Sequence, residues 1–271
     1  MTRILLVGCG KMGGALLAGW LEQGIEPSDA VVVDPHYDIE AGPAGVRSFS
    51  SPQDLPADFA PDVVLLAVKP QAMTEVVPAY RRFAGQAVFL SIAAGRTIAS
   101  LEALLGTDAA PNVAIVRAMP NTPAAVRRGA TGLFANRNVS GNQRRTCDQL
   151  VAAVGQAVWV ERESLLDAVT AVSGSGPAYV FLLVEALAAA GENLGLPPEL
   201  AATLARATVT GSGELLAQSP LPAAVLRQNV TSPNGTTHAA LQVLMKEGDD
   251  LAGLMRRATE AAARRAEELA G

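Results

Sequence analysis

The residues with the clearest chemical potential form the stretch Asn-Val-Thr-Ser-Pro-Asn-Gly-Thr-Thr-His, from Asn229 to His238. It combines small hydroxyl side chains with a Pro-Asn-Gly turn, and an apolar helical pattern follows from Ala239 to Met245. Backbone N–H groups at a helix start point outward without partners and favour an anion. Thr237 would hold its hydroxyl beside that anion and could bond a nitrogen or oxygen of the same small molecule. The alternative is a plain capped helix, because Ser, Thr and Asn cap helices without any ligand.

A glycine triplet near the other end of the chain predicts a nucleotide site. Gly8, Gly10 and Gly13 follow a short apolar strand and precede an amphipathic helical pattern. In a dinucleotide-binding fold the first glycine makes the turn, the second admits the pyrophosphate, and the third lets helix and strand pack closely. A second strand ends at Asp34, 21 residues after Gly13, where a carboxylate can bond the adenosine ribose. The residues expected at this part of the site are Gly8, Cys9, Gly10, Lys11, Met12, Gly13, Asp34 and Pro35.

Three predicted strand ends carry loops suited to the nicotinamide end of such a cofactor, which lies past the carboxyl ends of the strands. One loop places Lys69 between a buried strand and a proline, one is the small-residue sequence Ala-Ala-Gly at 93–95, and one holds Asn121 in the sequence Met-Pro-Asn-Thr-Pro. An ordinary solvated cation is the alternative for Lys69, although such a lysine would not require the proline that fixes its loop. The residues expected to contact the cofactor here are Ala67, Val68, Lys69, Ala93, Ala94 and Asn121.

The segment Ser-Gly-Ser-Gly-Pro at 173–177 predicts the start of a helix. Ser175 is the expected N-cap, with Pro177 in the first turn. Capping explains the serine and the proline but not the two glycines, which would let backbone come close to another group. A capped helix under close packing is the alternative.

The elements that position these residues divide the chain into two halves. Continuous β-branched runs alternate with helix-length segments in the first half, which predicts a mostly parallel sheet covered on both faces. From about Glu163 only long helical patterns remain. This small, alanine-rich helical half has a poor surface-to-volume ratio, so we expect it to bury area against another copy. The expected strands are 63–68, 88–93, 113–118, 131–135 and 157–160, and the expected helices include 142–154, 178–194, 198–217 and 251–269.

Composition narrows the function classes. The 271 residues carry a net charge of −5, which argues against a nucleic-acid partner. Two cysteines and two histidines cannot build a disulfide framework or a Cys/His metal cluster, so no metal site is expected, and Cys147 is expected to be buried packing. The longest apolar stretch, 178–184, ends at Glu185 and is short of a membrane span. We expect a soluble protein of the reduced cytoplasm.

The motifs together resemble the pyrroline-5-carboxylate reductase family, over essentially the whole chain. The last motif is specific to that family, whereas the glycine triplet is shared by many nucleotide folds. Asn234 stands where the family more often has glycine, a change that a left-handed turn tolerates. The motifs that carry the resemblance are Gly8-x-Gly-x-x-Gly13, Ala67-Val-Lys-Pro70, Met119-Pro-Asn-Thr-Pro123, Ser173-Gly-Ser-Gly-Pro177 and Asn229-Val-Thr-Ser-Pro-Asn-Gly-Thr-Thr237.

The resemblance implies an α/β protein with an N-terminal Rossmann-type dinucleotide-binding domain, residues 1–162, and a C-terminal all-helical dimerisation and substrate-binding domain, residues 163–271. It implies hydride transfer from NADPH or NADH to the C=N carbon of 1-pyrroline-5-carboxylate, which gives L-proline. The substrate carboxylate would bind the N–H groups of the 231–237 loop, with the ring nitrogen near Thr237, the expected catalytic residue. Asn229 joins the cofactor site, and the expected substrate-binding residues are Ser175, Gly176, Thr231, Ser232, Asn234, Gly235, Thr236 and Thr237.

Cofactor choice and assembly complete the expectation. Asp34 slightly favours NADH, because no arginine lies in the next ten residues to meet a 2′-phosphate, unless His36 or Arg47 supplies the positive charge. The resemblance implies an obligate oligomer in which the cofactor of one chain meets the substrate loop of its neighbour. A homodimer through the helical domain is the minimum unit, and a decamer of five dimers is the larger assembly considered. No membrane partner is expected.

Two other functions are weighed against this one. The β-hydroxyacid dehydrogenases combine similar domains but use a lysine on the helical domain as acid and base, and the predicted helix from Pro177 to Leu194 has no lysine. A non-catalytic dinucleotide sensor would leave the hydroxyl-rich loop before residue 239 without a task. Loss of absorbance at 340 nm when pyrroline-5-carboxylate is added distinguishes a reductase from a sensor.

Overall fold

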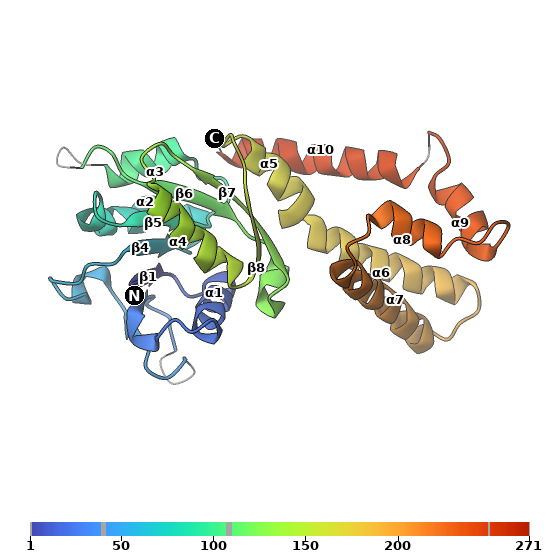
Figure 1. The fold of residues 1–271 in the computed structure, drawn as a ribbon, viewed down its shortest axis with the longest axis horizontal. Helices are drawn as coiled ribbons and strands as arrows, with labels where there is room; N and C mark the ends of the chain where they lie inside the picture. Colours follow the sequence, from blue (N-terminus) through green and yellow to red (C-terminus); the bar gives the residue numbers. More distant parts are fainter. Residues whose placement is uncertain (1, 39–41, 107–109, 249, 271) are drawn as a thin grey trace. The chain divides into compact units, whose positions relative to one another are not determined.

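The computed structural model describes residues 2–38, 42–106, 110–248 and 250–270. They form two compact units, coloured along the sequence in Figure 1. Unit 1 is Met1–Gly174 together with Ala262–Gly271, and unit 2 is Ser175–Ala261. The sequence predicts a domain boundary between residues 162 and 163, and this boundary remains a prediction. The two compact units are divided differently, after Gly174 and again before Ala262.

Unit 1 is built on an eight-stranded sheet. Neighbouring strands are parallel except for β6 and β7, which confirms the predicted mostly parallel sheet. All residues of β1, β2, β4 and β5 are buried, as expected for strands covered on both faces. The spatial order is β3-β2-β1-β4-β5-β6-β7-β8, with β1 Ile4–Val7, β2 Ala30–Val33, β3 Arg47–Phe49, β4 Val63–Leu66, β5 Val88–Ser91, β6 Ile115–Met119, β7 Gly129–Ala135 and β8 Gly155–Trp159.

Successive side chains of each strand pack into two separate hydrophobic cores, because they point to opposite faces of the sheet. Ile4 and Leu6 of β1 belong to the core under α1 (Lys11–Glu22) and α4 (Gly141–Ala152). Leu5 and Val7 belong to the core under α2 (Met73–Val76), the 3-10 helix Val77–Phe83 and α3 (Ile98–Leu105). Helices therefore cover both faces of the sheet, and Cys147 of α4 is fully buried in the first core, as expected.

The helix starts in unit 1 follow local capping chemistry. Thr97 precedes α3 and its hydroxyl accepts the Ser100 N–H at 3.1 Å. Ser140 and Gln143 form a capping box at the start of α4, near the beginning of the predicted polar helix. Strand β3 was not predicted from the sequence, because it is three residues long and begins with an exposed arginine.

The predicted helix start at Ser175 is wrong in one respect. Helical structure begins ten residues earlier with α5 (Leu165–Val169), continues through a π-helical turn (Thr170–Gly174) and leads directly into α6 (Gly176–Asn193). Ser175 has helical dihedral angles and its side chain makes no capping hydrogen bond. The reason is that the residues before Ser175 are already helical, so no helix N-terminus is present there to be capped.

Unit 2 is entirely helical and buries very few side chains. Close packing of α6 on α7 occurs at Gly191, where an added Cβ would lie 3.2 Å from the Cβ of Ala201. Among the described residues of this unit only Ala201 and Ala205 are buried, whereas large apolar side chains such as Phe181 are more than half exposed. This unit is built from α6, α7 (Pro198–Gln218), α8 (Ala223–Asn229), α9 (Thr236–Leu244) and the first part of α10 (Leu251–Ala270).

Candidate active site

The loop between β1 and α1 has the geometry of a pyrophosphate cradle. Gly8 has a φ of +85°, and a Cβ on Gly13 would lie 2.6 Å from the carbonyl oxygen of Gly8, so both positions require glycine. A Cβ on Gly10 would meet no atom within 4 Å, which leaves room for a bound group above that backbone. The three glycines therefore have the turn, approach and packing geometry that a bound dinucleotide needs.

Asp34 connects the end of β2 to this glycine loop. Its carboxylate accepts the Cys9 N–H at 2.6 Å and the His36 N–H at 2.8 Å. Burial, with the Asp34 carboxylate adding to it, raises the pKa of the Cys9 thiol to about 11, so this thiol stays protonated near neutral pH. Asp34 thus lies against the glycine loop, and its contact with the cofactor ribose stays a prediction.

Arg47 does not lie near Asp34. It pairs in register with Val31, at the amino end of β2, and lines a small cavity with Arg3 and Asp29. Asp34 follows the carboxyl end of the same strand. Of the two residues considered as partners for a 2′-phosphate, only His36 lies beside Asp34.

The loops expected at the nicotinamide end meet at one edge of the sheet. Ala67, Val68 and Lys69 follow β4, whereas Ala93 and Ala94 follow β5. Because β4, β5 and β6 are parallel, their carboxyl ends share an edge. Lys69 is exposed and precedes a 3-10 turn that begins at Pro70 (Pro70–Ala72).

Arg96 was missed by sequence reasoning and joins two of these loops. Its guanidinium donates to the carbonyl oxygen of Pro70 at 3.0 and 2.7 Å. The loop after β5 is thereby tied to the loop after β4. The sequence signal for this role was an arginine directly after the Ala-Ala-Gly sequence. That signal is weak, because an arginine in a loop is equally well explained as a solvated surface charge.

Asn121 lies at this edge after β6, but its side chain has structural partners. The amide nitrogen donates to the carbonyl and hydroxyl oxygens of Ser173, at 3.2 and 3.1 Å, and the amide oxygen accepts the Ala130 N–H at 2.8 Å. Asn121 therefore fixes the π-helical turn to the sheet, and its role in cofactor binding stays a prediction.

The two glycines that flank Ser175 differ in their surroundings. A Cβ on Gly174 would lie 2.9 Å from the Met119 methyl group, whereas one on Gly176 would meet nothing within 4 Å. The expected close approach thus occurs at the first of these two glycines.

The hydroxyl-rich loop lies between α8 and α9 in unit 2. Asn234 has a φ of +56°, the left-handed conformation that favours glycine and tolerates asparagine. The Gly235 N–H donates to the backbone carbonyl oxygen of Ser232 at 3.0 Å. Gly235 is the N-cap of α9, and no side chain caps that helix. The plain capped helix is therefore not what the structure contains. The N–H groups of the first turn, from Thr236 onward, have no carbonyl one turn back to bond, which favours an anion there.

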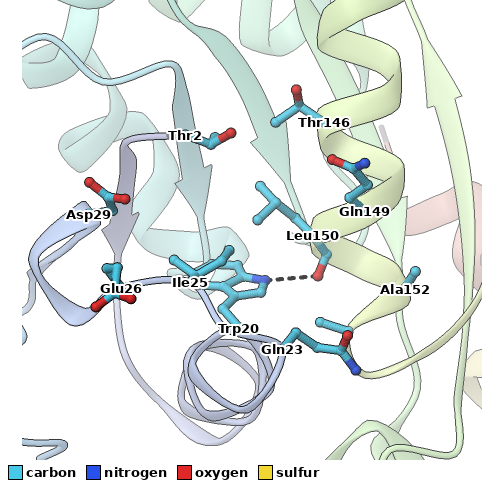
Figure 2. Close-up of a pocket in the computed structure, with 12 residues that line it drawn as sticks. Thr2, Trp20, Gln23, Ile25, Glu26, Asp29, Thr146, Gln149, Leu150 and Ala152 are labelled. Atoms are coloured by element: carbon cyan, nitrogen blue, oxygen red, sulfur yellow. Dashed lines mark hydrogen bonds between the residues drawn. The ribbon is translucent and has the colours of Figure 1, made fainter.

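A sizeable cavity lies away from these loops. It has a volume of about 580 Å³ and lies between α1, the following loop and α4, near the amino ends of the strands. Figure 2 shows the Trp20 indole there, which donates to the carbonyl oxygen of Leu150 at 2.8 Å. The residues that line it include no predicted site residue: Thr2, Trp20, Gln23, Gly24, Ile25, Glu26, Asp29, Thr146, Gln149, Leu150, Ala152 and Ala153. Among the described residues, no group of three His, Cys, Asp or Glu side chains is arranged to hold a metal ion.

Two family profiles match the chain in succession. Residues 3–95 match the profile described as NADP oxidoreductase, coenzyme F420-dependent. Residues 163–269 match the profile described as pyrroline-5-carboxylate reductase dimerisation.

Individual proteins are similar over the whole chain. The chain is 43% identical to a pyrroline-5-carboxylate reductase of Pseudomonas aeruginosa, over 99% of this chain and 97% of the relative, and 40% identical to one of Haemophilus influenzae, over 89% and 88%. The solved pyrroline-5-carboxylate reductase of Coxiella burnetii superposes with a TM-score of 0.91 at 36% identity, over 100% of this chain and 99% of that one. The Plasmodium falciparum pyrroline carboxylate reductase with NADP bound has a TM-score of 0.81 at 29% identity, over 100% and 98%.

Substitutions at two neighbouring glycines test the cofactor cradle. Gly13→Ala places its Cβ against the carbonyl oxygen of Gly8, and we expect it to lower the free energy of unfolding by about 1–3 kcal/mol. We also expect at least tenfold weaker NADH and NADPH binding. Gly14→Ala is the matched control, because the atom nearest to its Cβ would be the backbone oxygen of Cys9, 4.0 Å away. Alanine in that helix should stabilise the fold by about 0.4–1 kcal/mol and leave binding unchanged.

The measurements are urea denaturation and fluorescence titration with each cofactor. Equal effects of the two substitutions on binding would show that close packing at Gly13 does not matter for the cofactor site.

Proposed function

The chain belongs to the pyrroline-5-carboxylate reductase family, and from this we propose which of its residues carry the reaction. The protein is an NAD(P)H-dependent oxidoreductase that reduces 1-pyrroline-5-carboxylate to L-proline, the last step of proline biosynthesis. The proposal concerns the substrate loop, the cofactor preference, the assembly and a cytoplasmic location.

The substrate carboxylate binds the start of α9. The observation that supports this is the absence of a side-chain cap on a helix preceded by Ser, Thr and Asn residues. The hydroxyls of that loop are therefore free to face a ligand, apart from Thr231, whose hydroxyl donates to the Arg227 carbonyl oxygen at 2.6 Å and pins the loop to α8. N–H groups at a helix start suit a single carboxylate.

Thr237 is the catalytic residue of the proposal. It is the second residue of α9 and is partly buried, so its hydroxyl lies beside the proposed carboxylate site. When bound, NAD(P)H would supply a hydride to the C=N carbon. The proton already on the imine nitrogen would remain there as the N–H of proline. The hydroxyl of Thr237 would hold the ring nitrogen and so fix which atom is presented for transfer. A substrate that arrives protonated at nitrogen needs no histidine base.

A second copy of the chain covers the apolar helices of unit 2. The helical stretch Leu165–Asn193 is long and apolar enough, by length and composition alone, to cross a membrane, and it is longer than the seven-residue apolar run considered in the sequence. Phe181 and Leu182 on it are 61% and 63% exposed. The matching dimerisation profile spans this stretch, which supports a protein partner over a lipid one. In the proposed dimer, the cofactor of one chain meets the α9 loop of its neighbour.

Light scattering in detergent-free buffer tests this assembly. We expect a mass of at least twice the 27.9 kDa chain, because a lone copy would expose the apolar face of α6. A mass of ten chains would support the decamer. A monomer that becomes soluble only in detergent would instead indicate a membrane-bound helix.

Substitution of Thr237 tests its role. We expect Thr237→Ala to lower kcat/KM for the imino acid about tenfold to thousandfold, equivalent to about 1.4–4 kcal/mol of lost orientation and hydrogen bonding. Cofactor affinity should stay unchanged, and Thr237→Ser should restore most of the activity. Thr203→Ala is the control, since the Thr203 hydroxyl bonds its own helix at the Glu199 carbonyl oxygen. Steady-state kinetics with an unchanged kcat/KM for Thr237→Ala would remove this residue from the mechanism.

Cofactor preference tests the role of Asp34. A carboxylate beside the ribose repels a 2′-phosphate, and like charges at about 4 Å cost roughly 1–4 kcal/mol at effective dielectric constants of 80 to 20. We therefore expect kcat/KM with NADH to equal or exceed that with NADPH, and Asp34→Ser to shift the ratio toward NADPH. Asp38→Ser, four residues along and exposed, is the control. A preference for NADPH above tenfold in the unmodified protein would contradict the argument.

A further inference from the structure

An ion pair between a buried arginine and a partly buried glutamate lies behind the edge of the sheet that holds the proposed nicotinamide loops. Arg117 of β6 is 8% exposed, and its Nη1 atom lies 2.6 Å from Oε1 of Glu163. Arg117 pairs in register with Ser91 of β5 and Phe134 of β7, so it lies within the sheet and not at its border. A buried guanidinium is costly unless a carboxylate compensates its charge.

The same carboxylate oxygen has a second partner. Oε1 of Glu163 accepts the N–H of Ile98, the first residue of α3, at 2.7 Å. The loop 93–97 ends at that residue, and the segment 119–122 begins two residues after Arg117. Glu163 itself lies two residues before α5. One oxygen atom, at the residue two positions before α5, therefore connects the end of the loop 93–97 with the strand that leads into the segment 119–122.

Arg117 also borders the small cavity beneath these loops. The cavity measures about 40 Å³, and Ala93, Ala94, Met119 and Asp167 line it as well. The end of α10 packs on the same loop, since a Cβ on Gly95 would lie 2.7 Å from the Leu269 carbonyl oxygen. The backbone around the cavity is thus held by packing on one side and by the ion pair on the other.

A further carboxylate, that of Asp167, lies near this arginine. Burial raises the pKa of Asp167, and Glu267 of α10 and Glu163 add to that rise, whereas Arg117 acts against it. Arg117 thus interacts favourably with the Asp167 carboxylate of α5 as well as with Glu163. Of the two carboxylates, Glu163 is the one that accepts a hydrogen bond from the Arg117 guanidinium, at 2.6 Å.

We propose that Glu163 is a positioning residue for hydride transfer, which holds the loops 93–97 and 119–122 through Ile98 and Arg117 and balances the charge of Arg117. The proposal rests on the assignment of these loops to the nicotinamide end of the cofactor. Nicotinamide becomes positively charged when it gives up hydride. An uncompensated arginine at this edge would therefore disfavour the oxidised cofactor relative to the reduced one.

Glu163→Gln is the direct test, because the amide oxygen can still accept the Ile98 N–H while the charge is lost. We expect kcat to fall at least tenfold, and NAD⁺ binding to weaken at least threefold more than NADH binding in fluorescence titrations. Glu161→Gln is the matched control, because it removes an exposed carboxylate from the same segment. It should leave both quantities within twofold of the unmodified protein.

A double substitution separates positioning from fold stability. Arg117→Met with Glu163→Gln removes both charges of the ion pair, so neither member is left without the other. We expect this variant to fold, as judged by its thermal unfolding, and to show the unmodified ratio of NAD⁺ to NADH affinity. We expect kcat to stay low, because residue 163 still accepts the Ile98 N–H but no longer links it to residue 117. If Glu163→Gln does not fold, the double variant carries the test.

Two results would overturn the proposal. One is a folded Glu163→Gln variant that matches Glu161→Gln in kcat and in the affinity ratio. The other is a double variant with the kcat of the unmodified protein, which would show that the ion pair serves only the fold. Failure of the unmodified protein to consume NADH or NADPH with pyrroline-5-carboxylate would instead refute the assigned reaction.

Discussion

Parallel pairing of fully buried strands is the constraint on which the rest of unit 1 depends. The four residues of β1 and the four of β4 pair in register with no exposed position, and β2 and β5 extend the sheet on either side. Backbone N–H and C=O groups this deeply buried need partners, and the parallel ladder supplies them. Parallel pairing also puts successive carboxyl ends at one edge. The glycine loop, Asp34 and the loops after β4, β5 and β6 are neighbours for that reason alone.

What the sequence predicts well is what a short stretch of chain determines by itself. Gly8 and Gly13 could be assigned because the turn and the helix contact are made within a few residues, and the buried strands because each is one continuous apolar run. Strand β3 gives no such signal, since it exists through its pairing with β2. Ser175 was misassigned for a related reason. A serine before a glycine and a proline has the composition of a cap, but the helical turn before it depends on contacts such as that of Asn121 with Ser173.

The site residues that the sequence did not predict are those whose partners lie far along the chain. Glu163 and Arg117 are 46 residues apart, and either residue alone has a simple explanation as a surface charge. The one local signal was an arginine inside the apolar run 113–118, where a charged side chain needs a buried partner. Nothing in the sequence identifies which carboxylate that partner is. Asn121 was placed at the correct edge, but only its contacts show that its amide holds the π-helical turn.

Unit 2 has a different physical basis from unit 1. Fixing the backbone of one residue costs about 1–2 kcal/mol, and this unit buries only two alanines among its described residues. So small a core offsets little of that cost, and the match to a dimerisation profile agrees with burial of the exposed helices against a partner. The proposed substrate loop belongs to this unit, whereas the glycine loop is part of a unit with two cores of its own. The proposed cofactor site therefore lies in a unit with cores of its own, whereas under the proposed assembly the start of α9 depends on a partner for its order.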